Sequence, residues 1–155
     1  MAHELAQVNF SRLLAPIDSA QLAEFVAAID EVNALGEQAP GFVWRLQTEQ
    51  GNAMAVRAFE WDAGAHGVIV NLTVWTSAEA LRDFAYSGRH VGIMRRRREW
   101  FAAAAEPTTA LWWVPAGHRP STAEAEEAVR HLRAHGPTPA AFTFRTRFPP
   151  PASAA

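Results

Sequence analysis

Four stretches of the chain alternate apolar and polar residues with a period of two, which is the pattern of half-buried β-strands. They span residues 4–14, 42–48, 67–76 and 141–148. A short apolar run at residues 110–114 also predicts a strand. The stretch at 67–76 is the strongest, because it is rich in β-branched residues. Residues 53–61 are weaker and fit either an irregular strand or one arm of a hairpin.

Apolar residues at helical spacing separate these strands. Residues 22–36 show this spacing most clearly and predict an amphipathic helix. Further helices are expected at about residues 78–86, 91–105 and 122–134. The candidate N-caps are Thr76 or Ser77 for the first of these and Ser121 or Thr122 for the last.

The predicted order of elements is β-α-β-β-α-α-β-α-β. It contains the β-α-β-β-α-β plan of a ferredoxin-like fold. We therefore predict an α+β fold, with helices on one face of an antiparallel sheet and an appended C-terminal helix and strand. A length of 155 residues suits one domain. We expect it to span residues 1–155, with 149–155 as a frayed tail.

The alternation assigns the strand residues to two faces of the predicted sheet. One face is apolar and is expected to pack against the helices; its members are Val8, Phe10, Phe42, Trp44, Leu46, Val70, Leu72 and Val74. The other face mixes polar and aromatic residues; its members are Gln7, Asn9, Ser11, Val43, Arg45, Gln47, Ile69, Asn71, Thr73 and Trp75. A sheet covered by helices on one side leaves the other side bare. This predicts a homodimer with the mixed faces packed together, and an interface that includes Phe142 and Phe144.

Composition narrows the function. The chain has no cysteine, which excludes disulfides, thiolate catalysis and cysteine-ligated metals. A net charge of −2 gives no general attraction to nucleic acid or anionic membranes. No apolar stretch is long enough to cross a bilayer and the start lacks a secretory signal pattern, so we expect a soluble cytoplasmic protein. Six tryptophans suggest an aromatic-lined cavity or interface.

The mixed face carries the candidate binding residues. Asn9, Arg45 and Asn71 are expected to converge there, with Trp75 as an apolar wall. A few fixed polar groups among aromatic residues are typical of ligand pockets. The alternative interpretation is a solvated sheet face with one stray tryptophan. Trp113 is a further candidate wall, since the adjacent Trp112 and Trp113 point to opposite faces of their strand.

Two histidines are candidates for chemistry. His90 lies between two predicted helices and could act as a general acid or base, or ligate haem iron. His118 follows Pro-Ala-Gly and could bind substrate. Either could instead be a solvent-bonded or turn-bracing residue. His131 and His135 have metal-site spacing but no HExxH glutamate, so no metal is predicted.

Several segments together resemble a known family. They are residues 40–47 (PGFVWRLQ), 70–75 (VNLTVW), 90–101 (HVGIMRRRREWF) and 111–120 (LWWVPAGHRP). They resemble a bacterial domain-of-unknown-function family in the dimeric α+β-barrel superfamily, which also holds the antibiotic-biosynthesis monooxygenases. The resemblance implies a ferredoxin-like protomer, sheet-to-sheet dimerisation and a pocket between sheet and helices. Fold analogy alone does not establish a function.

Three functional hypotheses follow. The first is a small-molecule enzyme, a cofactor-independent monooxygenase acting on an aromatic or polyketide-like metabolite. In it His90 is the base, while Asn9, Arg45 and Asn71 bind substrate oxygens. The second is a haem protein with His90 or His118 as axial ligand, and the third is a non-catalytic module for a hydrophobic ligand. Dinucleotide-binding, P-loop and α/β-hydrolase chemistry lack their motifs.

Overall fold

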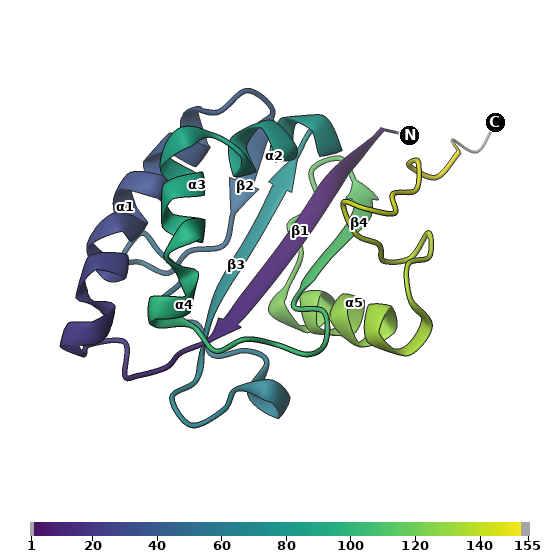
Figure 1. Cartoon of the computed structure of the whole chain (residues 1–155). Helices are drawn as coiled ribbons and strands as arrows, with labels where there is room; N and C mark the ends of the chain where they lie inside the picture. Colours follow the sequence, from purple (N-terminus) through teal and green to yellow (C-terminus); the bar gives the residue numbers. More distant parts are fainter. Residues whose placement is uncertain (1, 153–155) are drawn as a thin grey trace.

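The computed structural model describes residues 2–152, and its strands form one antiparallel sheet (Figure 1). The strands are β1 (His3–Arg12), β2 (Phe42–Arg45), β3 (Val68–Trp75) and β4 (Thr109–Pro115). Their order in the sheet is β2-β3-β1-β4, and every neighbouring pair is antiparallel. With its helices between the strands, the chain follows the ferredoxin-like plan, so the predicted α+β fold class is confirmed.

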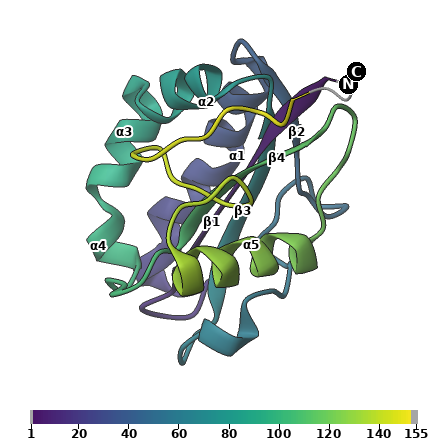
Figure 2. The same ribbon diagram turned by 90° about the vertical axis from the view of Figure 1, so that its right-hand side faces the viewer.

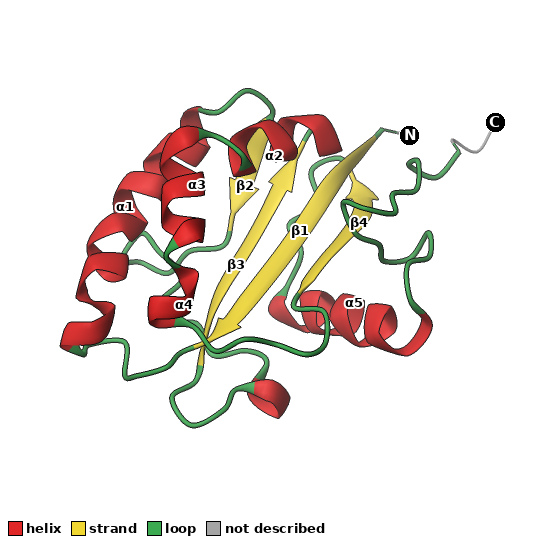
Figure 3. Cartoon of the chain, in the orientation of Figure 1, coloured by secondary structure: helices red, strands yellow, loops and turns green. Residues whose placement is uncertain are grey.

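Helices fill the connections between strands (Figure 3). They are α1 (Ala23–Gln38), α2 (Ala78–Ala85), α3 (Gly88–Arg95), α4 (Arg97–Trp100) and α5 (Thr122–His135), with 3-10 turns at Ala20–Leu22 and Glu60–Asp62. The hydroxyls of Ser77 and Ser121 each accept a hydrogen bond from a backbone N–H three residues on, so both serines are N-caps. None of the described helices is long and apolar enough to cross a bilayer.

The helix predicted at residues 91–105 is instead two shorter helices. The first begins at Gly88, and the helical run breaks at Arg96 before α4. The guanidinium of Arg96 pairs with Glu24 on α1 and with Glu99 on α4. These ion pairs tie the break to α1 across the helical layer.

The helices form layers on both sides of the sheet, not one. In Figures 1 and 2, α5 lies on the opposite side of the sheet from α1, α3 and α4. Most of the expected apolar face packs against α5 and residues 53–62, and its fully buried members include Val8, Leu72 and Val74. Phe42 is an exception, because the register of β2 against β3 shifts between Phe42 and Trp44 and Phe42 packs on Trp75 of the mixed face. The apolar face therefore packs against a helix, as expected, but the expectation that all helices lie on one face of the sheet is wrong (Figures 1 and 2).

The mixed face lies under α1, α2 and α3, so the expectation of a bare mixed face is also wrong. Trp75 is only 1% exposed, because Phe84 of α2 stacks on its ring and Phe42 meets it edge-on. Burial of this indole against aromatic neighbours is the physical reason for the arrangement. The homodimer through this face was predicted because the face was expected to be bare, and that reason no longer holds.

Residues 141–148 do not form the predicted appended strand. Phe142 makes a single bridge to Leu111 of β4, with backbone hydrogen bonds of 2.8 and 2.9 Å. The chain then turns, because the backbone N–H of Thr143 bonds the carbonyl of Thr146. Figure 2 shows this segment in yellow, running from the end of α5 past α2. The predicted frayed tail, residues 149–155, lies partly outside the described residues.

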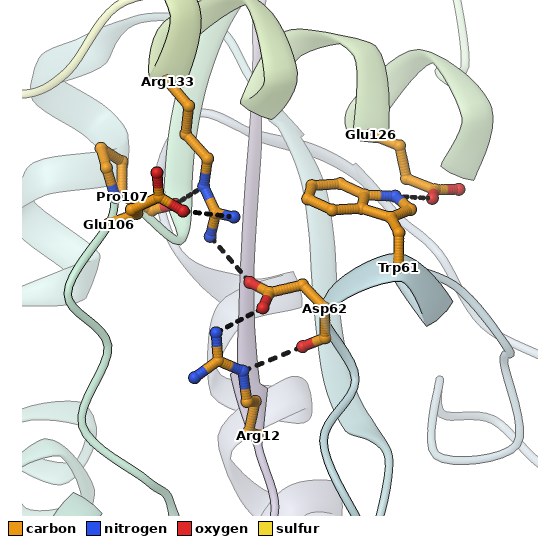
Figure 4. A network of polar contacts seen from close by, with 7 residues as sticks. All are labelled: Arg12, Trp61, Asp62, Glu106, Pro107, Glu126 and Arg133. Atoms are coloured by element: carbon orange, nitrogen blue, oxygen red, sulfur yellow. Dashed lines mark hydrogen bonds and ion pairs between the residues drawn. The ribbon is translucent and has the colours of Figure 1, made fainter.

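A polar network links the C-terminal end of β1, the turn at Glu60–Asp62 and α5 (Figure 4). Asp62 pairs with Arg12 at the end of β1 and with Arg133 of α5, the latter at 2.9 Å. Burial alone raises the pKa of Asp62, but the hydrogen bonds from the two arginines outweigh it and hold the pKa below its ordinary value. The network fixes residues 53–62 between sheet and helix.

Candidate functional site

A cavity lies between the mixed face of the sheet and helices α1, α2 and α3. It has one lobe of about 380 Å³ and an adjoining lobe of about 340 Å³. Its floor is set by register, since Gln7 pairs with Thr73 and Asn9 pairs with Asn71 across β1 and β3. Asn71 is exposed although it sits mid-strand, because the helices do not close over it.

Five of the predicted site residues line this one cavity: Asn9, Arg45, Asn71, Trp75 and His90. They come from three strands and one helix, far apart in sequence. The resemblance implied a pocket between sheet and helices, and the cavity lies there. Their roles in binding and catalysis stay predictions.

His118 lies outside the cavity, so the structure does not bring it together with His90 and the predicted binding residues. Its Nε2 lies 2.7 Å from a carboxylate oxygen of Glu124 in the first turn of α5. The other oxygen of Glu124 accepts a hydrogen bond from Trp112 Nε1 at 2.9 Å. His118 therefore belongs to a contact between the β4–α5 connection and α5, on the apolar side of the sheet.

Trp113 shares the face of Trp75 but does not line the cavity either. Leu5 of β1 stands between them, since it pairs with both. The indole N–H of Trp113 donates to the carbonyl of Phe148 at 2.8 Å, and its ring packs near Phe142. The C-terminal segment thus covers this tryptophan, which the sequence could not show because that segment was expected to be a strand.

His90 is held in one tautomer. Its Nδ1 lies 2.8 Å from the carbonyl oxygen of Ala85, which only accepts, so Nδ1 carries the proton and Nε2 a lone pair. Its ring centre lies 5.3 Å from that of Phe84. Burial lowers the pKa of His90, with a smaller opposing effect from the Ala85 hydrogen bond. The imidazole is therefore neutral near pH 7 and has the state that a general base needs.

Arg45 presents one unused donor. Its Nε and Nη2 both bond to Glu37 Oε1 of α1, at 2.9 and 2.8 Å. Its Nη1 is buried and has no partner among the described residues. An unmatched buried donor costs about 1–3 kcal/mol or more when charged. A ligand oxygen in the cavity would satisfy it.

Sequence reasoning gave no role to Gln7 and Thr73, although it placed both on the mixed face. Trp75 Nε1 donates to Thr73 Oγ1 at 2.9 Å, and Thr73 Oγ1 in turn donates to Gln7 Oε1 at 2.8 Å. Since Gln7 Oε1 is the acceptor, its NH₂ group is left to donate toward the cavity. Alternation placed both residues on one face, but their pairing depends on the register of β1 against β3, which only the structure shows.

A family model matches residues 4–155, nearly the whole sequence, and its description is Domain of unknown function (DUF3291). The chain belongs to the DUF3291 family. The predicted membership in a domain-of-unknown-function family is thereby confirmed. No curated protein matches this DUF3291 chain.

Solved structures with a similar fold are distant in sequence. SnoaB, a cofactor-independent oxygenase from Streptomyces nogalater, is 18% identical, with 76% of this chain and 97% of that chain covered and a TM-score of 0.45. A Nitrosomonas europaea protein described as a candidate antibiotic biosynthesis monooxygenase is 10% identical, with coverage of 78% and 97% and a TM-score of 0.47. Rv0793 from Mycobacterium tuberculosis is 12% identical, with coverage of 76% and 99% and a TM-score of 0.45.

The charged groups around the cavity of this DUF3291 chain are all basic. The described lining residues include Arg45, Arg97 and Arg145, and none of the described lining residues is a carboxylate. Arg45 keeps an exposed counter-ion in Glu37, which itself does not line the cavity. The cavity therefore favours a ligand with an anionic or strongly polar oxygen.

The described residues contain no group of three or more side chains suited to hold a metal ion. The spaced histidines are engaged elsewhere: His131 bonds Thr138 Oγ1 at 2.7 Å, and its ring lies 4.7 Å from that of His135. This pair lies on α5, across the sheet from the cavity.

Proposed function

We propose that the DUF3291 chain is a small-molecule enzyme that binds an aromatic or polyketide-like metabolite in this cavity, with His90 as the base. The observation that carries the proposal is the fixed tautomer of His90. Its Nδ1–H donates to the Ala85 carbonyl, so the lone pair is on Nε2 at a cavity wall. A neutral, oriented imidazole is suited to remove an acidic C–H or O–H proton.

The anion formed by that proton transfer would be stabilised by donors that are already in place. Arg45 offers its unpartnered Nη1, and Gln7 offers an amide whose orientation is set by Thr73. Asn71 adds an exposed amide in the middle of the floor. Donors preorganised around a developing oxyanion lower the barrier to its formation.

Oxygenation without a cofactor then requires an electron-rich substrate anion. For an aromatic ketone with an acidic CH₂ group, the balanced reaction is CH₂ + O₂ → C=O + H₂O. The substrate supplies all four electrons, one oxygen atom enters the product and the other leaves as water. The residues of the cavity need to supply only a base that removes the proton and donors that stabilise the resulting anion.

Two alternatives keep specific support. A haem protein would use His90 as its axial ligand, since His118 lies on the other side of the sheet. A non-catalytic binding module needs only the apolar walls and the polar floor. An absorption spectrum of the purified protein separates them: a strong Soret band supports haem, and a featureless visible spectrum leaves the enzyme and the binding module.

Oxygen uptake tests the enzyme against the binding module. The probe is 1,8-dihydroxyanthrone, which has an acidic CH₂ between two aromatic rings. We expect protein-dependent uptake that falls by about 100-fold or more in His90→Gln. The matched control is His118→Gln, which removes a histidine on the far side of the sheet and should keep the wild-type rate. Equal rates in His90→Gln and wild type would refute the role of His90.

Assembly and location complete the proposal. Homodimerisation stays a prediction, with an interface outside the two covered faces of the sheet, and light scattering at micromolar concentration checks it. We propose a cytoplasmic location. Cytoplasmic proteins rarely contain disulfides, and the sequence has no cysteine to form one. Nucleic acid and membranes are not expected partners at its net charge of −2.

A further inference from the structure

We infer that the cavity takes an elongated ligand whose two apolar ends flank an anionic or strongly polar centre. This inference rests on the proposed function, because it describes the ligand of the same cavity. It adds a second apolar subsite, the smaller of the two lobes, which the sequence-based hypotheses did not include.

The cavity has two apolar lobes. The aromatic lobe, of about 380 Å³, has apolar lining residues Phe42, Trp75, Leu81, Phe84, Tyr86 and Phe144. The aliphatic lobe, of about 340 Å³, has apolar lining residues Phe25, Ile29, Leu46, Ile69, Ile93 and Phe101. Each lobe has the volume of a small-ligand site.

The residues that line both lobes form a polar waist. Its polar members are Asn9, Asn33, Arg45, Asn71, His90 and Thr109. Polar groups therefore gather where the lobes meet, and large apolar side chains dominate both ends. Of the basic side chains, only Arg45 and His90 line both lobes, whereas Arg145 lines the aromatic lobe alone and Arg97 the aliphatic lobe alone. A ligand with its polar group at one end would leave either this waist or an apolar lobe unmatched.

The same order recurs along the elements that border the cavity. On β3, Trp75 lies at the aromatic lobe, Asn71 at the waist and Ile69 at the aliphatic lobe. On α1, the order runs from Gly36 at the aromatic lobe to Ile29 at the aliphatic lobe. Trp75 and Ile69 are six positions apart on one strand, so the ligand could extend over about 20 Å.

The chemistry of the waist points to an anionic centre. Arg45 lines both lobes and has its Nη1 buried without a partner among the described residues. Gln7, two positions from Asn9 on β1, is oriented by Thr73 to donate. The described residues of both lobes include no carboxylate to repel an anion.

Three fluorescent or absorbing probes test this shape. The first, 8-anilinonaphthalene-1-sulfonate, has two aromatic arms with an anion beside their junction. The second, 1-naphthalenesulfonate, has the anion but one arm, and the third, 1-anilinonaphthalene, has both arms but no anion. We expect the first to bind at least about tenfold more tightly than either of the others, which corresponds to about 1.4 kcal/mol.

Cavity-filling variants locate the arms. Ser11→Phe fills the aliphatic lobe and Ala85→Phe fills the aromatic lobe. Each should weaken the two-armed anionic probe by fivefold or more, whereas only one of them should weaken 1-naphthalenesulfonate. The matched control, Ala134→Phe on the exposed surface of α5, should leave all three affinities unchanged. Thermal melts of each variant confirm that it is folded.

Three results would overturn the inference. They are equal affinity for the one-armed and two-armed sulfonates, two-armed binding that survives Ser11→Phe or Ala85→Phe, and no binding of any probe. These experiments measure binding and not turnover. If they overturn the inference, the oxygen-uptake assay with His90→Gln still tests the proposed function independently.

Discussion

The two faces of strand β3 serve different purposes, although their residues alternate along one segment. Val70, Leu72 and Val74 point into the core against α5, and none of them is more than 3% exposed. Asn71 and Thr73 point into the cavity under α1–α3. One strand can therefore contribute buried core residues from one face and cavity-lining residues from the other. The two sets are separate because successive side chains of a strand point to opposite faces.

The two faces also differ in how they are covered. On the α5 side, small residues such as Ala125 and Ala128 bring the helix close to the sheet, and the space is filled. On the other side, apolar side chains line the two ends and polar side chains line the middle, and a cavity stays open between the sheet and the helices. In the middle of β3, stability is therefore expected to depend on the side chains that face α5.

The largest expected effect is on stability at Leu72. Leu72→Ala removes a side chain that is 1% exposed and should lower the free energy of unfolding by about 2–5 kcal/mol. The neighbouring Asn71→Ala, on the cavity face, should change it by no more than about 0.5 kcal/mol. Urea unfolding of both variants measures the contrast. Similar losses at the two positions would show that both faces are packed alike.

Asp62→Asn should have the next largest effect. It leaves Arg12 and Arg133 without their shared carboxylate and should cost about 2–3 kcal/mol, less than a fully buried pair because Arg12 is partly exposed. The folded pKa of Asp62 lies below its ordinary value, so its stabilisation is present above about pH 4. It is lost as the pH falls through the folded pKa. Unfolding between pH 7 and pH 3 should show a flatter acid side in the variant.

Asn71→Leu tests whether the cavity face of β3 contributes to binding and not to stability. The fold should be kept, because Asn71 is exposed, while binding of 8-anilinonaphthalene-1-sulfonate should weaken by about tenfold as a hydrogen bond to the anion is lost. Fluorescence titration measures the affinity, and the circular dichroism spectrum checks the fold. Undiminished binding in Asn71→Leu would show that Asn71 does not contact the ligand.

The smallest expected effect is the pH response of His90. Burial lowers its folded pKa below the ordinary value near 6.5, so the unfolded chain takes up this proton first as the pH falls. Stability should decline slightly below pH 6.5, and His90→Gln should remove that decline. An NMR titration should place the midpoint of His90 below the ordinary histidine value near 6.5. A midpoint at or above 6.5 would contradict the neutral, buried imidazole.

The candidate site was partly predictable. Asn9, Arg45, Asn71 and Trp75 were grouped correctly because strand alternation fixes which residues share a face. Trp113 was misplaced because the path of residues 141–148, which cover it, depends on a turn and not on alternation. The hydrogen-bond chain through Gln7 and Thr73 needs the register of β1 against β3, which the sequence does not state.

The sequence by itself determined the elements of this protein, since periodicity and N-caps are local properties of the chain. It also determined the two faces of β1 and β3 and the exclusion of cysteine chemistry. It did not determine the faces of β2, because a register shift between Phe42 and Trp44 interrupts the alternation. Only the tertiary structure decided which face each helix covers. That choice depends on the packing of distant segments, such as α5 against Leu72 and α2 against Trp75. The same packing turned an expected bare face into a cavity, because α1, α2 and α3 cover the mixed face without filling the space between helices and sheet.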